Sequence, residues 1–321
     1  MPARLLVKER HGVVDRPADQ LSELRGEHPC WLDITNPQSE EFKLVAGELS
    51  LHPLAVEDAQ HGHQRPKIDQ YDSHYFIVFY GLETPSPGVV RYHEVAIFVA
   101  ANAIVTVHQG DFSARQAVEK RFREGRLQTT GLLLHALLDT MVDQYFEVVD
   151  EFGERIELLE EFIASESGPN LHRAHAPLKE LFLVKRDLLQ LRKTIAPERD
   201  VLQVLVRGDI RELRETGRRA YFQDVYDHII RVTDEIDTFR ELTSNVIDAY
   251  LAAASNRLNE VMKVLTSIAT VLLVLTVVTG FFGQNWDFIP YGSLPLFWLS
   301  MAVTAVLAIG LAMYFHRRGW L

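Results

Sequence analysis

Two long apolar runs lie near the end of the chain, with a short polar segment between them. The runs extend from Val264 to Phe282 and from Leu296 to Phe315, and neither contains a charged residue. Each has roughly 19 or 20 residues, enough for an α-helix to cross a hydrocarbon core of about 30 Å. We therefore predict two transmembrane helices, at 264–282 and 296–315, joined by a loop at 283–295.

A long uninterrupted helical pattern leads into the first apolar run. It starts near residue 215, and between Gly217 and Gly280 it contains neither proline nor glycine. At 1.5 Å per residue such a helix would be about 100 Å long, and only its last third would lie in the membrane. We therefore predict a stalk helix over residues 213–282, whose last part is the first membrane span.

The first 125 residues have an α/β pattern. Runs rich in Val, Ile, Phe and Tyr predict strands, and Pro85, Pro87 and Gly88 interrupt the chain between two of them, as a hairpin connection would. Asn36-Pro37 predicts a helix start, because Asn can cap a helix and Pro fits its first turn. The predicted strands are Arg4–Val7, Tyr75–Tyr80, Val89–Ala100 and Ala103–His108. We expect residues 1–125 to form an α/β cytoplasmic domain.

Beyond about residue 128 helical spacing replaces the strand pattern. Thr129–Ser165 predicts a helix that ends at Ser167-Gly168-Pro169-Asn170, and Leu171–Val206 predicts a second helix with a break at Ala196-Pro197. We assign residues 126–212 to a cytoplasmic helical pair. The acidic residues concentrated between Asp139 and Glu166 are more simply a solvated helix face than a surface that attracts cations.

The composition narrows the possible functions. The net charge of −11 argues against a nucleic-acid-binding protein, which is usually basic. Cys30 is the only cysteine, so no intrachain disulfide can form. This is typical of a protein whose larger part lies in the cytosol. The N-terminus has no positive flank before an apolar core, so we expect no signal peptide. Because motifs for nucleotide binding and nucleophilic catalysis are missing, we expect neither an enzyme nor an organic cofactor.

Positive charge flanks the two spans on one side. Arg257 and Lys263 precede the first span and His316, Arg317 and Arg318 follow the second, whereas the loop has neither Lys nor Arg. Cytoplasmic flanks carry the excess of Lys and Arg. We therefore expect a multi-pass protein of the cell inner membrane with both termini cytoplasmic, a basic tail at 316–321 and the loop at 283–295 outside.

Small and polar residues form a stripe along one face of the long helix. The stripe enters the bilayer, where polar groups prefer a protein interior or a water-filled cavity. Several copies with this face inward would enclose a pore, but small residues also serve plain helix packing, and the stripe alone does not separate the two interpretations. The candidate pore-lining residues are Asp248, Ser255, Asn259, Met262, Leu265, Ala269, Leu273, Thr276 and Gly280.

Around an axial channel each of these residues would become a ring. Asp248 would give a ring of carboxylates and Asn259 and Asn285 rings of amide oxygens. Apolar constrictions that gate by dewetting would come from Met262, Leu265 and Leu273. Oxygen ligands without thiolates or clustered imidazoles suit hard cations such as Mg²⁺. Since Mg²⁺ gives up its water reluctantly, we expect the amide rings to hold it through its hydration shell.

Several segments of the chain resemble the CorA magnesium-channel family. Together these segments are highly specific for the family and cover most of the chain, whereas Gly-x-Asn alone would not identify it. The segments are Asn259-Glu260-Val261-Met262-Lys263-Val264-Leu265-Thr266, Gly283-x-Asn285, the basic tail, His52-Pro53-Leu54-Ala55-Val56-Glu57-Asp58-Ala59, Gln64-Arg65-Pro66-Lys67 and Tyr221-Phe222-x-Asp224-Val225-Tyr226-Asp227-His228.

The resemblance implies a funnel-shaped homopentamer that takes up Mg²⁺, with Co²⁺ and Ni²⁺ as further candidates. Its outer mouth, the selectivity filter, would be formed by Gly283, Gln284 and Asn285, which hold a hydrated cation. Asp224 matches a family carboxylate that binds regulatory cytoplasmic Mg²⁺ between subunits, where the ion holds the closed state. Glu83 is the candidate for the second carboxylate of this site, because it follows a predicted strand.

Two departures from the family pattern leave alternatives open. Gln284 stands where the family usually has Met, a position that also varies in the zinc-transporting ZntB branch, and Val274 replaces a common Pro, so the helix would be straighter. One alternative is therefore ZntB-like Zn²⁺ transport, coupled to protons or not. A second is a membrane-anchored sensor or scaffold that transports nothing. We expect the pairs His61/His63 and His172/His175 to have no metal role.

Overall fold

The computed structural model describes residues 3–10, 12–26, 28–165, 175–208, 210, 218–284 and 293–320. The chain divides into two compact units, Met1–Asn245 and Val246–Leu321. Helix α8 (Arg218–Phe282) runs through the boundary between them. It begins close to the predicted start near residue 215 and continues without interruption to the end of the first apolar run.

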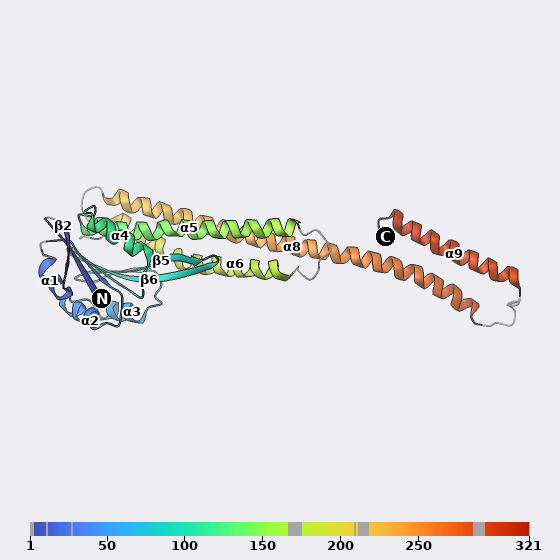
Figure 1. Cartoon of the computed structure of the whole chain (residues 1–321), viewed down its shortest axis with the longest axis horizontal. Helices are drawn as coiled ribbons and strands as arrows, with labels where there is room; N and C mark the ends of the chain where they lie inside the picture. The colour runs from blue at the N-terminus through green and yellow to red at the C-terminus, as the bar shows by residue number, and fades with distance from the viewer. Residues whose placement is uncertain are drawn as a thin grey trace. The chain divides into compact units, whose positions relative to one another are not determined.

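The first unit is built on a seven-stranded sheet with the order β2-β1-β3-β7-β6-β5-β4 (Figure 1). Neighbouring strands pair antiparallel except for β3 and β7, which are parallel. The strands are β1 (Ala3–Glu9), β2 (Gly12–Arg16), β3 (Cys30–Ile34), β4 (Lys67–Gln70), β5 (Tyr75–Ser86), β6 (Val89–Ala100) and β7 (Ala103–His108).

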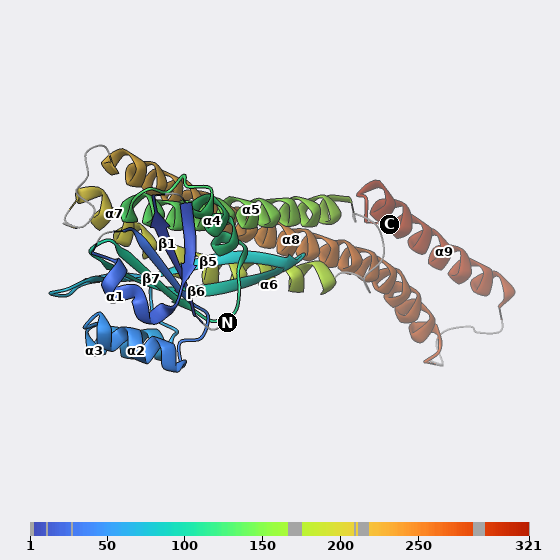
Figure 2. The same ribbon diagram turned by 60° about the vertical axis from the view of Figure 1, so that its left-hand side comes forward.

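Helices cover both faces of this sheet, so alternate residues of each central strand enter two different cores. Along β5, Phe76 and Val78 belong to one core, and Ile77 and Phe79 belong to the other. The first core lies under α1 (Leu21–Leu24), α2 (Glu40–Glu48) and α3 (Pro53–His61), and the second lies under α4 (Ser113–Arg123) and α5 (Thr130–Ser165) (Figure 2). Burial on both faces explains why the central strands are apolar throughout rather than alternating.

The β5–β6 hairpin confirms the predicted chain reversal. Ser86 pairs with Val89, so Pro87 and Gly88 form the two-residue turn, and Gly88 has the positive φ (76°) that the second central residue of a type II turn requires. Pro85 lies inside β5, where the pairing register shifts between Glu83 and Ser86. The predicted bounds of β6 and β7 are correct, β1 and β5 are longer than predicted, and β2, β3 and β4 were not predicted.

The predicted helix start at Asn36-Pro37 is wrong. Helix α2 begins at Glu40, and its cap is Ser39, whose hydroxyl accepts the backbone N–H of Phe42 at 3.3 Å. Asn36 instead forms a turn, because its side-chain oxygen accepts the backbone N–H of Gln38 at 2.9 Å. Both Asn36 and Ser39 are cap-forming residue types, and the structure selects Ser39, which lies three residues before the first buried apolar position, Phe42.

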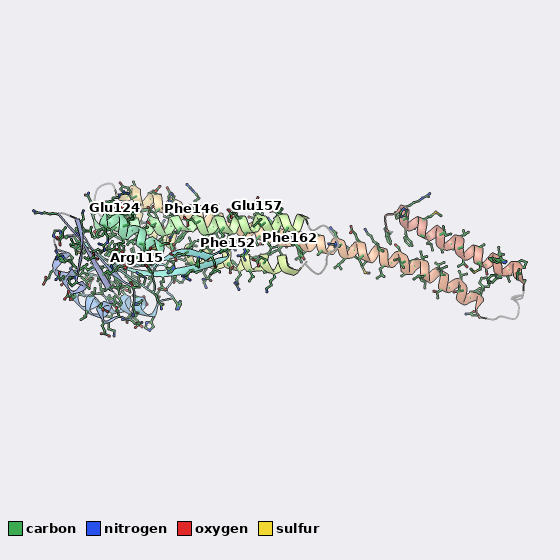
Figure 3. All side chains as sticks on the ribbon, in the orientation of Figure 1. Arg115, Glu124, Phe146, Phe152, Glu157 and Phe162 are labelled. Carbon is green, nitrogen blue, oxygen red and sulfur yellow. The ribbon has the colours of Figure 1, made fainter. Side chains whose placement is uncertain are left out.

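Four helices complete the first unit. Helix α6 (His175–Ile195) and helix α7 (Glu198–Arg207) replace the single predicted helix, and the break at Ala196-Pro197 is confirmed. The predicted stop at 167–170 lies outside the described residues. Buried apolar residues of α5, α6, α7 and the first part of α8 share one core. Most acidic side chains of α5 are exposed, as expected for a solvated face, and Phe146, Phe152 and Phe162 follow the helix along its length (Figure 3).

The second unit consists of the rest of α8 and of α9 (Leu294–Arg317), two helices that are long and apolar enough to cross a membrane. Helix α9 ends in a Schellman motif, in which Gly319 (φ 67°) donates to the carbonyl of His316 and Trp320 donates to the carbonyl of Phe315. The indole ring of Trp320 stacks on Phe315 at 5.6 Å, which completes the apolar contact typical of this cap.

Candidate functional site

The predicted pore-lining residues all lie on the part of α8 that belongs to the second unit, and every one of them is exposed. Among the apolar members, Met262 is 56% exposed, Leu265 58% and Leu273 62%. These fractions are high for large apolar side chains within one chain. The polar member Thr276 donates its hydroxyl to the carbonyl of Leu272 at 2.8 Å, so it needs no external partner.

The opposite side of α8 is the less exposed one between Ser267 and Phe282. Ser267 is fully buried, and Val271, Val274 and Val278 are half-buried, at steps of three and four. On α9 buried or half-buried residues recur every four positions, at Ser300, Thr304, Ala308 and Ala312. Matching stripes of this kind are expected where two helices pack side by side. At 100° per residue, this packing stripe of α8 lies roughly opposite the predicted pore stripe.

The candidate filter begins where α8 ends. The backbone N–H of Gly283 donates to the carbonyls of Thr279 at 3.0 Å and Gly280 at 3.1 Å, and that of Gln284 donates to Phe281 at 3.4 Å. A β-carbon on Gly283 would lie 3.3 Å from the Thr279 carbonyl oxygen, so glycine suits this closing turn. Asn285, the residue on which the filter prediction depends most, lies outside the described residues.

A group of side chains that could hold a cation lies in the first unit, between α5 and α8. One ligand atom each of Asp139, Asp224 and His228 lie within 4.8 Å of one another. Asp143 extends this group, since its carboxylate lies 3.8 Å from Nδ1 of His228. Phe146 meets the His228 ring edge-on at 5.7 Å and limits its orientation. Two carboxylates and an imidazole form a donor set that suits a divalent cation.

The electrostatics of this cluster favour an added positive charge. Burial, together with the nearby charge of Asp139, raises the pKa of the Asp143 carboxyl. Burial lowers the pKa of His135, although Asp139 one turn away opposes that shift. Carboxylates held this close repel one another, and a bound cation would relieve that repulsion. Sequence reasoning identified Asp224 but missed Asp139 and His228, although the i, i+4 pairs His135/Asp139 and Asp224/His228 were a readable signal.

Glu83, the predicted partner of Asp224, has a different environment within the chain. Its carboxylate accepts the backbone N–H of Ser113, the first residue of α4, and lies 3.1 Å from Nε2 of His93. The helix N-cap, Phe112, has no side-chain cap of its own, so Glu83 supplies it from β5. The structure therefore does not bring Glu83 together with Asp224 in one subunit and gives Glu83 a capping role.

The histidine pairs show no metal-binding arrangement within the part of the chain that the structure describes. His61 places Nδ1 3.0 Å from the carbonyl of Glu57. His63 has a positive φ (58°), and its backbone N–H is directed at the carboxylate of Glu94, which also accepts the N–H of Gln64 at 3.2 Å. The loop is thus shaped around a carboxylate. His172 lies outside the described residues.

Comparison with known proteins identifies the family of the chain. The family described as CorA-like Mg²⁺ transporter protein matches residues 26–317. The cobalt/magnesium transport protein CorA of Thermotoga maritima is 34% identical over 304 residues, covering 91% of this chain and 84% of that protein. The zinc transport protein ZntB of Cronobacter sakazakii is 27% identical over 322 residues, covering 97% and 93%.

The fold is also that of a solved transporter. The complete structure of the CorA magnesium transporter from Methanocaldococcus jannaschii superposes with a TM-score of 0.85 at 20% identity, covering 100% of this chain and 99% of that one. The shared fold comprises an N-terminal α/β domain, a long stalk helix and two C-terminal membrane helices. With the family match over most of its length, the chain belongs to the CorA-like Mg²⁺ transporter family and is a membrane transporter rather than an enzyme.

Proposed function

We propose that this protein is a homopentameric channel that carries Mg²⁺, and also Co²⁺ or Ni²⁺, into the cell. The observation that supports it best is the division of α8 in the second unit into two faces. Between Ser267 and Phe282 one side of the helix is buried or half-buried within the unit, whereas the stripe from Asp248 to Gly280 is exposed in the single chain. Five copies that turn this stripe inward would cover it and create a pore with polar rings from Asp248 to Asn259 and apolar rings from Met262 to Leu273.

Ion selection in this channel falls to the residues that follow α8. Asn285 would hold the hydrated cation with a ring of amide oxygens, and Gly283 and Gln284 would place that ring at the outer mouth. Gln284 adds a second ring of amide groups where the family usually has a thioether. We therefore expect a mouth that contacts the hydration shell through more hydrogen bonds and tolerates several divalent cations.

We assign regulation by cytoplasmic Mg²⁺ to the cluster between α5 and α8. We assign its carboxylates to Asp224 and Asp139, with His228 beside them, in place of the pair Asp224 and Glu83. The short distances among these three groups support that assignment, as does the engagement of Glu83 with Ser113 and His93. A bound ion would hold α5 and α8 in one arrangement, and its loss would shift the population toward the conducting state.

The topology follows from the charged flanks of the spans. The basic residues before the membrane-spanning part of α8 and at the end of α9 support a topology in which both termini lie in the cytoplasm of an inner-membrane protein. The driving force for uptake is then the ion gradient and the membrane potential, about 2.3 kcal/mol per charge for each 100 mV.

The test is ion uptake into proteoliposomes that contain the full chain. Entry of Mg²⁺, and its loss in Asn285→Ala, is the expected result. An Asn285→Ala variant with unchanged flux would contradict the filter assignment, and a protein that carries no ion at all would instead be a membrane-anchored sensor or scaffold.

Zinc transport is a second candidate, favoured by the similarity to ZntB along nearly the whole chain and by the unusual Gln284. The same vesicles loaded with a zinc-sensitive dye, with and without a pH gradient, separate the two functions. Zinc entry without magnesium entry would replace the first proposal, and dependence on the gradient would show coupling to protons.

A further inference from the structure

A glutamate in the first unit is buried, and no cationic side chain among the described residues is paired with it. Glu198 is the first residue of α7 and is 0% exposed. Its Oε1 accepts the backbone N–H of Tyr80 at 2.9 Å, and its Oε2 lies 2.8 Å from the phenol oxygen of Tyr145. Neither partner is charged, and an ionised carboxylate buried in this way is strongly disfavoured.

The position of this group follows from the topology of the sheet. Strand β4 ends the sheet beside β5, and its pairing reaches Val78, opposite Lys67. Tyr80 lies just beyond that point, so no strand pairs with its N–H and C=O on this edge. Glu198 accepts that N–H, and the hydroxyl of Tyr145 contacts that carbonyl. The two side chains, from α7 and α5, therefore take the place of a missing neighbouring strand.

Counting hydrogens determines the protonation state that fits this geometry. The phenol oxygen of Tyr145 touches two oxygens, the carbonyl of Tyr80 and Oε2 of Glu198, but it carries one hydrogen. The carbonyl can only accept. If Glu198 were ionised, one of the two oxygen contacts would contain no hydrogen. If Glu198 is protonated, its O–H donates to Tyr145, Tyr145 donates to Tyr80, and Tyr80 donates back to Glu198, so every group is satisfied.

The surrounding groups agree with a neutral carboxyl. Burial raises the pKa of Glu198 well above its ordinary value, and burial together with Glu198 raises that of Tyr145. On the neighbouring strand β6, Glu94 adds negative charge near the hydroxyl of Tyr80. On β4, which packs against α7, Lys67 is already paired with Asp69 at 2.8 Å and Asp58 at 2.7 Å. The charged residues that follow on α7, Arg199 and Asp200, are exposed.

We propose that Glu198 is a proton-binding site. Its proton completes the hydrogen bonds that hold α7 and α5 against the unpaired edge of β5, and its loss at alkaline pH releases α7 from the sheet. The ligand is a single proton, and the site is independent of the transport pathway. Below the ordinary pKa of a glutamate, 4.5, the carboxyl is protonated in both the folded and the unfolded chain. Between that value and the raised pKa of the folded state only the folded chain holds the proton, so stability falls as pH rises.

The size of the effect follows from proton linkage. Within that pH window the folding equilibrium constant of the wild type falls tenfold for each pH unit, relative to a chain without the titrating carboxyl. Glu198→Gln is such a chain, because its amide donates to Tyr145 and accepts from Tyr80 without titrating. Glu94→Gln is the matched control, since it removes a neighbouring carboxylate and leaves the proposed proton in place.

The experiment measures thermal unfolding and amide hydrogen exchange of α7 in the purified full-length protein from about pH 5 to about pH 9. We expect wild type and Glu94→Gln to lose protection in α7 as pH rises, whereas Glu198→Gln does not. Parallel pH profiles of wild type and Glu198→Gln would overturn the proposal. Infrared spectra provide a second readout, because the wild type should show a protonated-carboxyl band at neutral pH that shifts in Tyr145→Phe. A band that is absent, or that Tyr145→Phe leaves unmoved, would also overturn it.

Discussion

The ring of Phe239 on α8 lies so close to Gly153 on α5 that a β-carbon on the glycine would come within 2.8 Å of the ring's Cζ atom. Both residues belong to the first unit, and Phe239 packs against the core that α5 and α8 share. A rigid aromatic ring cannot move aside as the end of a flexible side chain could. Gly153 therefore determines how closely the two helices approach.

Replacing Gly153 by Ala tests this contact. We expect Gly153→Ala to lower the free energy of unfolding by about 1–3 kcal/mol, because the added methyl group forces the helices apart. Gly47→Ala is the control, since Gly47 is an exposed glycine of α2 with nothing near its missing β-carbon. That variant should gain about 0.5–1 kcal/mol from its better helix propensity. If thermal unfolding finds both variants equally stabilised, the contact between Gly153 and Phe239 does not limit how closely α5 and α8 approach.

The two faces of α8 can be distinguished by thiol labelling in the membrane. The only native thiol, Cys30, is fully buried, so the background should be low. A polar thiol reagent should reach Ala269→Cys from the pore and block ion flux, because that position lies on the exposed stripe. Val271→Cys, two residues further along but on the packing stripe, should leave flux unchanged. Equal block of both variants would remove the pore assignment.

The regulatory assignment predicts which carboxylates respond to Mg²⁺. Asp224→Asn and Asp139→Asn should each raise the Mg²⁺ concentration needed to protect the protein from protease by at least about tenfold, or ~1.4 kcal/mol. Glu83→Gln should weaken the start of α4 but leave that concentration unchanged. The opposite pattern, with a shift for Glu83→Gln and none for Asp139→Asn, would restore the pair predicted from the sequence.

Cys30 provides a probe of unfolding in the sheet. Burial raises the pKa of its thiol to about 12, so almost no thiolate forms near neutral pH. Since the thiolate is the reactive species, we expect a thiol reagent to leave the folded protein unmodified and to react once β3 opens in denaturant. Rapid labelling of the native protein would mean that β3 opens without global unfolding, contrary to its complete burial.

Local patterns predicted much of the fold because they act within one element. The two spans, the break at Ala196-Pro197 and the bounds of β6 and β7 follow from apolar runs and from residues that stop a helix or strand. Strands β3 and β4 were missed because they have four or five residues, too few for a clear period. In β3 the apolar run also contains Asp33, whose charge is satisfied only in the fold by Thr106 at 2.6 Å and by His108 at 3.0 Å.

For the candidate sites, too, some features could be predicted from the sequence and others were visible only in the structure. By itself the sequence determined that the chain has two membrane spans, a long helix with a polar and small-residue stripe, and the motifs of a divalent-cation transporter, because hydropathy and spacing are properties of neighbouring residues. Only the tertiary structure decided that Asp139 meets Asp224 and His228, that Glu83 caps α4, and that Glu198 is buried against Tyr145. These relations join residues far apart in the chain, and burial changes the charge that each group can carry only after the helices have packed.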